Sequence, residues 1–147
     1  MNVLDMLAAN EVSIGQLYNE YANMFPEYSD FWDKLAKEEY NHARWLTEVS
    51  RKAVEGSLHI DERRFTKEAV ESYRKYLQGE CEKARREGIS LLQALSIALN
   101  IEESLIESKY FEVLEADPTE LRRILSDLEI ATKEHMRRVR NIWLENR

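Results

Sequence analysis

Glutamate and histidine occur in this sequence at helical positions where a buried stripe would normally carry apolar side chains. Glu39 and His42 belong to the tetrad Glu-Tyr-Asn-His, and residues three apart on a helix project to the same side. Carboxylates supply hard oxygen ligands and imidazole supplies a neutral nitrogen. Together these donors suit iron or manganese, with zinc as a further option. The tetrad by itself is a weak signal for a metal site, because glutamate and histidine occur three apart by chance in many helices.

Three further residues of these types lie near the middle of other apolar stripes. An ionised carboxylate in a helical core is costly unless it is paired or bound to a metal, so several such groups are best explained by one shared partner. The predicted metal ligands are Glu11, Glu39, His42, Glu102 and His135. No catalytic residue can be assigned apart from this set.

Each residue also has an ordinary structural explanation. Glu39 could be a surface acid beside Glu38, and His42 a core histidine whose nitrogens are hydrogen-bonded. The combination favours the metal site. Mid-stripe glutamates on the first and third helices, Glu-x-x-His on the second and histidine on the fourth match the arrangement of carboxylate-bridged di-metal bundles.

The composition indicates long helices as the elements that position these residues. The chain has 147 residues, of which 33% are charged, with only four glycines and two prolines. Sheet proteins need more turn residues than this, so we predict an all-α single domain over residues 1–147. The predicted first helix runs from about Val3 to Met24 and stops at Pro26. The second opens with Ser29 as its N-cap and closes at Gly56.

The second half of the chain shows a second helical hairpin. Ser90 and Gln93 form a capping box that opens the third helix, and Asp117-Pro118-Thr119 separates it from the fourth. Residues 57–88 form a long connection, closed by Gly88, in which helical spacing from about Thr66 to Arg86 predicts one or two short helices. A long connection can cross a bundle, so the expected fold is an up-down four-helix bundle with a long helical crossover between helices 2 and 3.

At this point the chain resembles the ferritin-like superfamily, and within it the rubrerythrin-type proteins. The matching segments are Ala-Asn-Glu11-Val-Ser-Ile-Gly-Gln-Leu-Tyr, Glu-Glu39-Tyr-Asn-His42-Ala, Ala-Leu-Ser-Ile-Ala-Leu-Asn-Ile-Glu102-Glu and Thr132-Lys-Glu-His135. The resemblance implies a mono- or dinuclear iron site with peroxide- or oxygen-linked redox chemistry. It also implies that Tyr18 and Tyr110 lie close to the ligands, although ordinary core packing would explain both tyrosines as well.

Thr132 departs from this resemblance, which implies a bridging glutamate three residues before the second histidine. Two divalent ions would carry four positive charges, against three negative charges on Glu11, Glu39 and Glu102. Glu134 is adjacent, but one helical position turns a side chain by about 100°. We expect Glu134 to be a solvated acid rather than a ligand.

The net charge and the cysteine content limit the kinds of partner that we expect for this chain. The net charge of -7 argues against a nucleic-acid binder, and we interpret Arg137-Arg138-Val139-Arg140 as a solvated helix face. No apolar run is long enough to cross a membrane and none resembles a signal peptide, so we expect a cytoplasmic protein. Cys81 is the only cysteine, which leaves no rubredoxin-like tail and requires an external electron donor for any redox activity.

Two functions remain open at the level of sequence. The first is a redox-active metalloprotein, in which Glu11, Glu39 and His42 hold one ion while Glu102 and His135 help to hold a second. The second is a catalytically degenerate bundle that binds one metal ion or none and acts as a binding or scaffold protein. A helical interaction module with no metal history is a weaker third option. We interpret the tryptophans as packing residues that could also meet at a homodimer contact: Trp32, Trp45 and Trp143.

Overall fold

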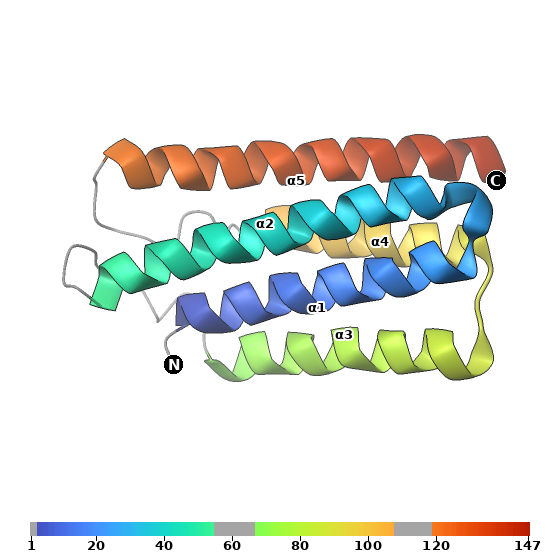
Figure 1. Ribbon diagram of the computed structural model, residues 1–147, viewed down its shortest axis with the longest axis horizontal. Helices are drawn as coiled ribbons and strands as arrows, with labels where there is room; N and C mark the ends of the chain where they lie inside the picture. The colour runs from blue at the N-terminus through green and yellow to red at the C-terminus, as the bar shows by residue number, and fades with distance from the viewer. Residues whose placement is uncertain (1–2, 55–66, 108–118) are drawn as a thin grey trace.

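The structure, a computed structural model, describes residues 3–54, 67–107 and 119–147, and these residues form an all-helical protein (Figure 1). None of the described residues belongs to a β-strand. No helix within these ranges combines the length and the apolar character needed to cross a membrane. The elements are α1 (Val3–Met24), a 3₁₀ turn η1 (Pro26–Tyr28), α2 (Ser29–Val54), α3 (Lys67–Glu87), α4 (Leu91–Glu107) and α5 (Thr119–Asn146).

The chain direction reverses from each helix to the next, so α1, α3 and α5 run one way and α2 and α4 the other (Figure 1). Helix α1 packs against α2 on one side and α3 on another, while α4 packs against α5. Contacts between α2 and α5 complete the assembly. The five helices therefore pack together, and α3 returns the chain along α1 to the end of the molecule where α4 begins.

A close helix–helix approach joins α1 to α2 at Gly15. A β-carbon placed on Gly15 would lie 2.7 Å from the ring of Tyr40, which is closer than real contacts allow. The Tyr40 hydroxyl extends past this point and accepts a hydrogen bond of 2.8 Å from the Asn19 amide. The missing side chain at position 15 thus lets the Tyr40 ring lie directly on α1, four residues along the chain from Glu11.

Helix α3 confirms the helical spacing predicted from about Thr66 to Arg86, although it is one helix of 21 residues and so longer than the short helices expected. Its polar composition has a physical reason. Helix α3 covers α1 with a narrow stripe, so few of its positions need to be apolar; the buried residues are Val70, Leu77, Cys81 and Ala84. Polar contacts add to this packing. The Asn10 amide donates a 3.2 Å hydrogen bond to the Val70 carbonyl, and Arg85 pairs with Glu20 at 2.8 Å.

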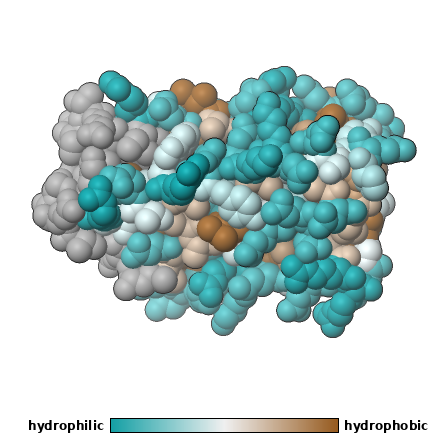
Figure 2. All heavy atoms as spheres, in the orientation of Figure 1, coloured by the Kyte–Doolittle hydropathy of each residue, from teal (hydrophilic) through white to brown (hydrophobic). Residues whose placement is uncertain are grey.

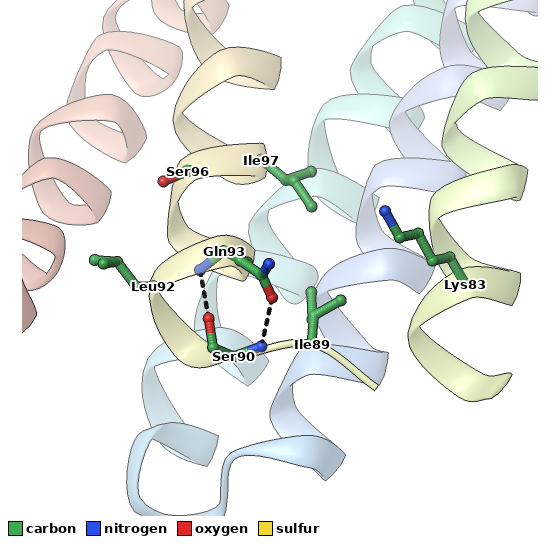
Figure 3. Close-up of a pocket in the computed structure, with 7 residues that line it drawn as sticks. All are labelled: Lys83, Ile89, Ser90, Leu92, Gln93, Ser96 and Ile97. Carbon is green, nitrogen blue, oxygen red and sulfur yellow. Dashed lines mark hydrogen bonds between the residues drawn. The ribbon is translucent and has the colours of Figure 1, made fainter. Parts of the chain in front are cut away.

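The predicted opening of α4 is confirmed. The Ser90 amide donates to Gln93 Oε1 at 2.9 Å, and the Gln93 amide donates to Ser90 Oγ at 3.1 Å, which is the reciprocal capping box (Figure 3). Gly88 breaks the preceding helix with φ of 71°, a conformation that favours glycine. The Asp117-Pro118 restart lies outside the described residues, although α5 does begin at Thr119.

Helix α2 begins at Ser29 as predicted, but the prediction that Ser29 is its N-cap is wrong. An N-cap residue has non-helical dihedral angles, whereas Ser29 has φ of -56° and ψ of -45° and is already helical. The 3₁₀ turn that starts at Pro26 runs directly into α2, so the chain turns without a separate cap. Pro26 therefore begins the short turn that joins α1 to α2.

The basic run on α5 is only partly the solvated face predicted for it. The Arg137 and Arg140 side chains are 59% and 48% exposed and pair with Glu134 and Glu103. Arg138 is 20% exposed instead, because it turns toward α2. Hydrophilic side chains cover much of the face seen in Figure 2, with small separate hydrophobic areas between them.

The tryptophans differ in environment. Trp32 is fully buried, whereas 39% of Trp45 is exposed. Trp143 donates a 3.1 Å hydrogen bond to Ser96, which joins α5 to α4. Packing thus accounts for Trp32 and Trp143, and Trp45 extends from the side of His42 to the surface, with ring centroids 5.5 Å apart.

Candidate metal centre

All five predicted ligands are buried. Each is at most 2% exposed, although every one of them is titratable: Glu11 on α1, Glu39 and His42 on α2, Glu102 on α4 and His135 on α5. Buried charged residues are rare unless they are paired. Four helices therefore contribute acids and imidazoles to one polar interior.

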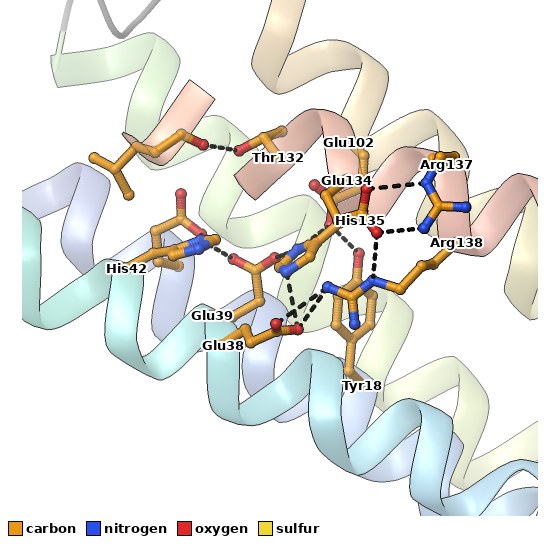
Figure 4. Close-up of polar contacts among 12 residues, drawn as sticks. Tyr18, Glu38, Glu39, His42, Glu102, Thr132, Glu134, His135, Arg137 and Arg138 are labelled. Carbon is orange, nitrogen blue, oxygen red and sulfur yellow. Dashed lines mark hydrogen bonds and ion pairs between the residues drawn. The ribbon is translucent and has the colours of Figure 1, made fainter. Parts of the chain in front are cut away.

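Glu39 occupies the centre of this cluster, with one carboxylate oxygen toward each histidine (Figure 4). Its Oε2 lies 3.3 Å from Nδ1 of His42, and its Oε1 lies 2.9 Å from Nδ1 of His135. The two imidazole rings lie nearly parallel, at 20°, with centroids 5.2 Å apart. The Glu-x-x-His spacing on α2 thus places both side chains on one face, as the sequence predicted, and α5 supplies the second imidazole.

The remaining two glutamates lie on opposite sides of Glu39. Oε2 of Glu11 is 4.0 Å from Nδ1 of His42. Oε1 of Glu102 is 3.5 Å from Nδ1 of His135. The cluster therefore consists of two similar halves, which share the Glu39 carboxylate. Each half has one imidazole and one further carboxylate of its own.

Tyr18 lies beside the cluster, as the resemblance implied. Its hydroxyl donates a 2.8 Å hydrogen bond to Oε1 of Glu102, and the tyrosine is fully buried. Burial and the neighbouring carboxylate of Glu102 both raise the pKa of Tyr18, so this hydroxyl remains a donor. Tyr110, the second tyrosine of that prediction, lies outside the described residues.

Sequence reasoning missed Glu38 and Arg138. Oε2 of Glu38 lies 3.2 Å from Nε2 of His135, on the side of the ring opposite Glu39. Arg138 donates two hydrogen bonds to the Glu38 carboxylate, at 2.8 and 3.1 Å. Because Arg138 is three residues after His135, the same i, i+3 rule that paired Glu39 with His42 could have identified this neighbour on α5.

Thr132 lies one turn before His135 and is 1% exposed. Its hydroxyl donates a 2.8 Å hydrogen bond to the Leu128 carbonyl of its own helix. The side chain is uncharged, so position 132 adds no negative charge to the cluster. Glu134 points away and pairs with Arg137, with 45% of its side chain exposed. The prediction that Glu134 is a solvated acid is confirmed.

The buried carboxylates and the His135 imidazole shift one another's pKa values strongly. Burial lowers the pKa of His135, but hydrogen bonds with Glu102, Glu38 and Glu39 outweigh this and raise it to about 12. Burial raises the pKa of Glu39, but its hydrogen bonds with Glu11, His135 and His42 bring it well below the ordinary range. These pKa shifts favour a protonated His135 side chain between the carboxylates when no metal is bound.

The pKa values of the two outer acids, Glu102 and Glu38, shift in opposite directions. Burial and the charge of Glu39 raise the pKa of Glu102 to about 7. Burial also acts on Glu38, but hydrogen bonds from His135 and Arg138 prevail and lower its pKa to about 2. Two close carboxyls cannot both ionise easily, so Glu102 retains a proton where Glu39 loses one.

The donor atoms fit a metal ion in type and position. Ligand atoms of Glu39, His42 and His135 all lie within 4.8 Å of one another, and all three residues are buried. Oε2 of Glu102 is buried and has no hydrogen-bond partner among the described residues, whereas Oε2 of Glu39 faces Nδ1 of His42 at 3.3 Å. Buried polar atoms are normally satisfied, and an open carboxylate oxygen close to two imidazoles suits a transition metal.

Comparisons with models of known protein families, with curated proteins and with solved structures find no match to this chain.

Proposed function

We propose that this chain is a ferritin-like metal-binding protein, of the rubrerythrin type, with iron as its metal. In this proposal α1, α2, α4 and α5 are the bundle and α3 is the crossover. The observation that carries it is the position of Glu39, whose two carboxylate oxygens face the Nδ1 atoms of two buried histidines. A carboxylate in this position can bridge two ions or hold one between both imidazoles.

The residues present favour one tightly held ion over two. Glu39, His42 and His135 would be the common ligands, with Glu11 and Glu102 completing either half. Thr132 removes the fourth carboxylate, so two divalent ions would exceed the negative charge of the cluster. Glu38 would accept the Nε2 proton of His135 and so direct Nδ1 toward the metal.

Redox activity is part of the proposal. When bound, iron would supply a change of oxidation state, which carboxylates and imidazoles lack. The chain's own residues would bind the ion, exclude water and hold a proton donor, Tyr18, next to Glu102. An external donor is proposed as the source of electrons, since a cysteine-ligated iron site needs several cysteines and the sequence has Cys81 alone.

The test is metal analysis of protein purified without added metal, followed by anaerobic titration with ferrous iron. We expect about one tightly bound ion per chain, lost in His42→Ala and in His135→Ala. Glu103→Gln and Glu134→Gln are matched controls, since each acid is adjacent in sequence to a proposed ligand and is 41% or 45% exposed. Equal metal content in the parent and both histidine variants would refute the proposal.

A degenerate, metal-free scaffold is the second candidate. It is favoured by the cation at His135, which lies within 3.5 Å of carboxylate oxygens of Glu38, Glu39 and Glu102 and so balances charge without metal. The two candidates differ in their response to a chelator. A metalloprotein loses thermal stability on metal removal, whereas a scaffold keeps the same melting temperature.

A further inference from the structure

The orientation of the His135 ring depends on contacts between α2 and α5. Glu39 belongs to α2, whereas His135 reaches it from α5. Nδ1 of His135 lies 2.9 Å from Oε1 of Glu39 and 3.5 Å from Oε1 of Glu102, so this nitrogen faces the proposed metal position. The opposite nitrogen, Nε2, is buried and lies 3.2 Å from Oε2 of Glu38. The ring therefore extends from the proposed ligands on one side to an outer carboxylate on the other.

A metal ion on Nδ1 would determine which nitrogen of this ring carries the proton. A neutral imidazole has one N–H group, so a metal on Nδ1 leaves the proton on Nε2. This proton needs an acceptor, because Nε2 is buried and buried polar groups are normally satisfied. The Glu38 carboxylate faces Nε2, and acceptors in this position hold a ligand ring in its binding orientation. Metal binding by His135 therefore requires the Glu38 carboxylate to stay where it is.

Arg138 holds the Glu38 carboxylate. The Glu38 side chain is 32% exposed, and a long side chain at a helix surface has several rotamers available. Nη2 of Arg138 donates hydrogen bonds to both Glu38 oxygens, at 2.8 and 3.1 Å. Arg138 is itself 20% exposed and lies between Glu38 and Glu134, whose Oε1 is 3.8 Å from Nε of Arg138 (Figure 4). Charge-assisted contacts of this kind fix the geometry of both partners.

We propose that Arg138 is a positioning residue of the metal centre: it fixes Glu38, and Glu38 fixes the His135 ring with Nδ1 toward the ion. This rests on the proposed function. Arg138 would supply no ligand atom, because a guanidinium group has donors and no acceptor. Its positive charge taken alone opposes the binding of a cation. A favourable effect of Arg138 on metal affinity is therefore the signature of positioning.

The first test is the affinity of Arg138→Met for ferrous iron in an anaerobic titration. Loss of a nearby positive charge would by itself tighten metal binding. Positioning predicts the opposite sign, and we expect the affinity to fall about tenfold. Arg137→Met is the matched control, because Arg137 is the adjacent arginine, is 59% exposed and pairs with Glu134; its affinity should equal that of the parent. Equal or tighter binding by Arg138→Met would overturn the inference.

The second test asks whether Arg138 acts through Glu38. Glu38→Ala removes the acceptor of the Nε2 proton and should weaken ferrous binding about tenfold or more. Addition of Arg138→Met to this variant should cause no further loss, because the carboxylate that Arg138 holds is already gone. If the losses in the two single variants instead multiply in the double variant, Arg138 acts by another route and the proposal is wrong.

A proton spectrum of the cobalt(II)-loaded protein reports on the His135 ring itself. Cobalt(II) is paramagnetic, so it moves the Nε2 proton signal of a coordinated histidine outside the ordinary range. The signal that is missing in His135→Ala belongs to His135. In Arg138→Met this proton should exchange with water several-fold faster, while the corresponding proton of His42 keeps its rate. Equal acceleration of both protons would show a general loosening of the fold and overturn the positioning role.

The metal-binding step separates this inference from the function on which it rests. If the parent binds neither iron nor cobalt, the proposed function is refuted and the positioning role with it. If the parent binds metal and Arg138→Met binds it equally well, the positioning role alone is refuted.

Discussion

The Nδ1 atom of His135 lies 2.9 Å from Oε1 of Glu39, although the two residues are 96 positions apart in the chain. This contact joins α5 to α2, two helices that are not neighbours in sequence. Both side chains are 1% exposed. The two residues form a buried ion pair without metal, and in the proposed function they are adjacent ligands of the metal. The predictions below separate these two states.

Thr132→Glu should have opposite effects in the two states. With iron or manganese, a fourth carboxylate one turn before His135 should raise the metal content toward two ions per chain and strengthen oxygen or peroxide reactivity. Without metal, the added buried acid should destabilise the fold by about 3 kcal/mol. Metal counting and thermal melts of each form measure both effects.

The control for Thr132→Glu is Ile130→Glu, which adds the same charge to α5 at a position that is 63% exposed. It should leave the metal content unchanged and should change the free energy of unfolding by no more than about 0.5 kcal/mol. If Thr132→Glu behaves like this control, position 132 does not face the cluster.

Glu102→Gln should flatten the pH dependence of metal-free stability. The pKa of Glu102 is raised from 4.5 to about 7, so the folded state binds an extra proton between these values. The associated stability is fully present below pH 4.5 and is lost as the pH rises through 7, on the order of 3 kcal/mol in total. Urea unfolding from pH 4 to 8 gives the curve. Glu103→Gln should follow the parent, and a Glu102→Gln curve parallel to the parent would contradict the assignment.

Metal binding should release protons. The bound ion must displace the proton of His135, whose pKa is raised to about 12, and below pH 7 also that of Glu102. Affinity should therefore rise with pH, with about two protons released per ion at pH 6 and about one at pH 8. Calorimetric titrations in buffers of different ionisation enthalpy count these protons. Glu102→Gln should release one fewer at pH 6, and an affinity independent of pH would rule out the mechanism.

Gly15→Ala should destabilise the fold by about 2 kcal/mol, because the new methyl group would meet the Tyr40 ring at 2.7 Å. Gly79→Ala on α3 is the control. Nothing lies within 4 Å of its added β-carbon, so the higher helix propensity of alanine should stabilise the protein by roughly 0.5–1 kcal/mol. Chemical denaturation of both variants measures the difference, and equal effects at the two glycines would contradict the close approach of α1 and α2.

Local signals determined the helices and the candidate ligands. Periodicity placed α1 over Val3–Met24, and the reciprocal spacing of Ser90 and Gln93 located the start of α4. The i, i+3 geometry of Glu39 and His42 is likewise a property of one helix. Such features need no partner helix, which is why the sequence alone could specify them. The same local view placed α3 within one residue at each end but expected a shorter helix, since its narrow apolar stripe is buried only against α1.

Only the tertiary structure decided which of these residues meet. The sequence grouped Glu11 with His42 and Glu102 with His135, but it could not place Glu39 between the two groups, because that position depends on how α1 and α5 pack against α2. Nor could it identify Glu38 and Arg138, which look like ordinary surface charges until α5 packs beside α2. Helical periodicity fixes the direction of a side chain relative to the axis of the helix that carries it. The distance to another helix depends on packing of the whole chain, and the proton balance of His135 and Glu102 depends on that distance.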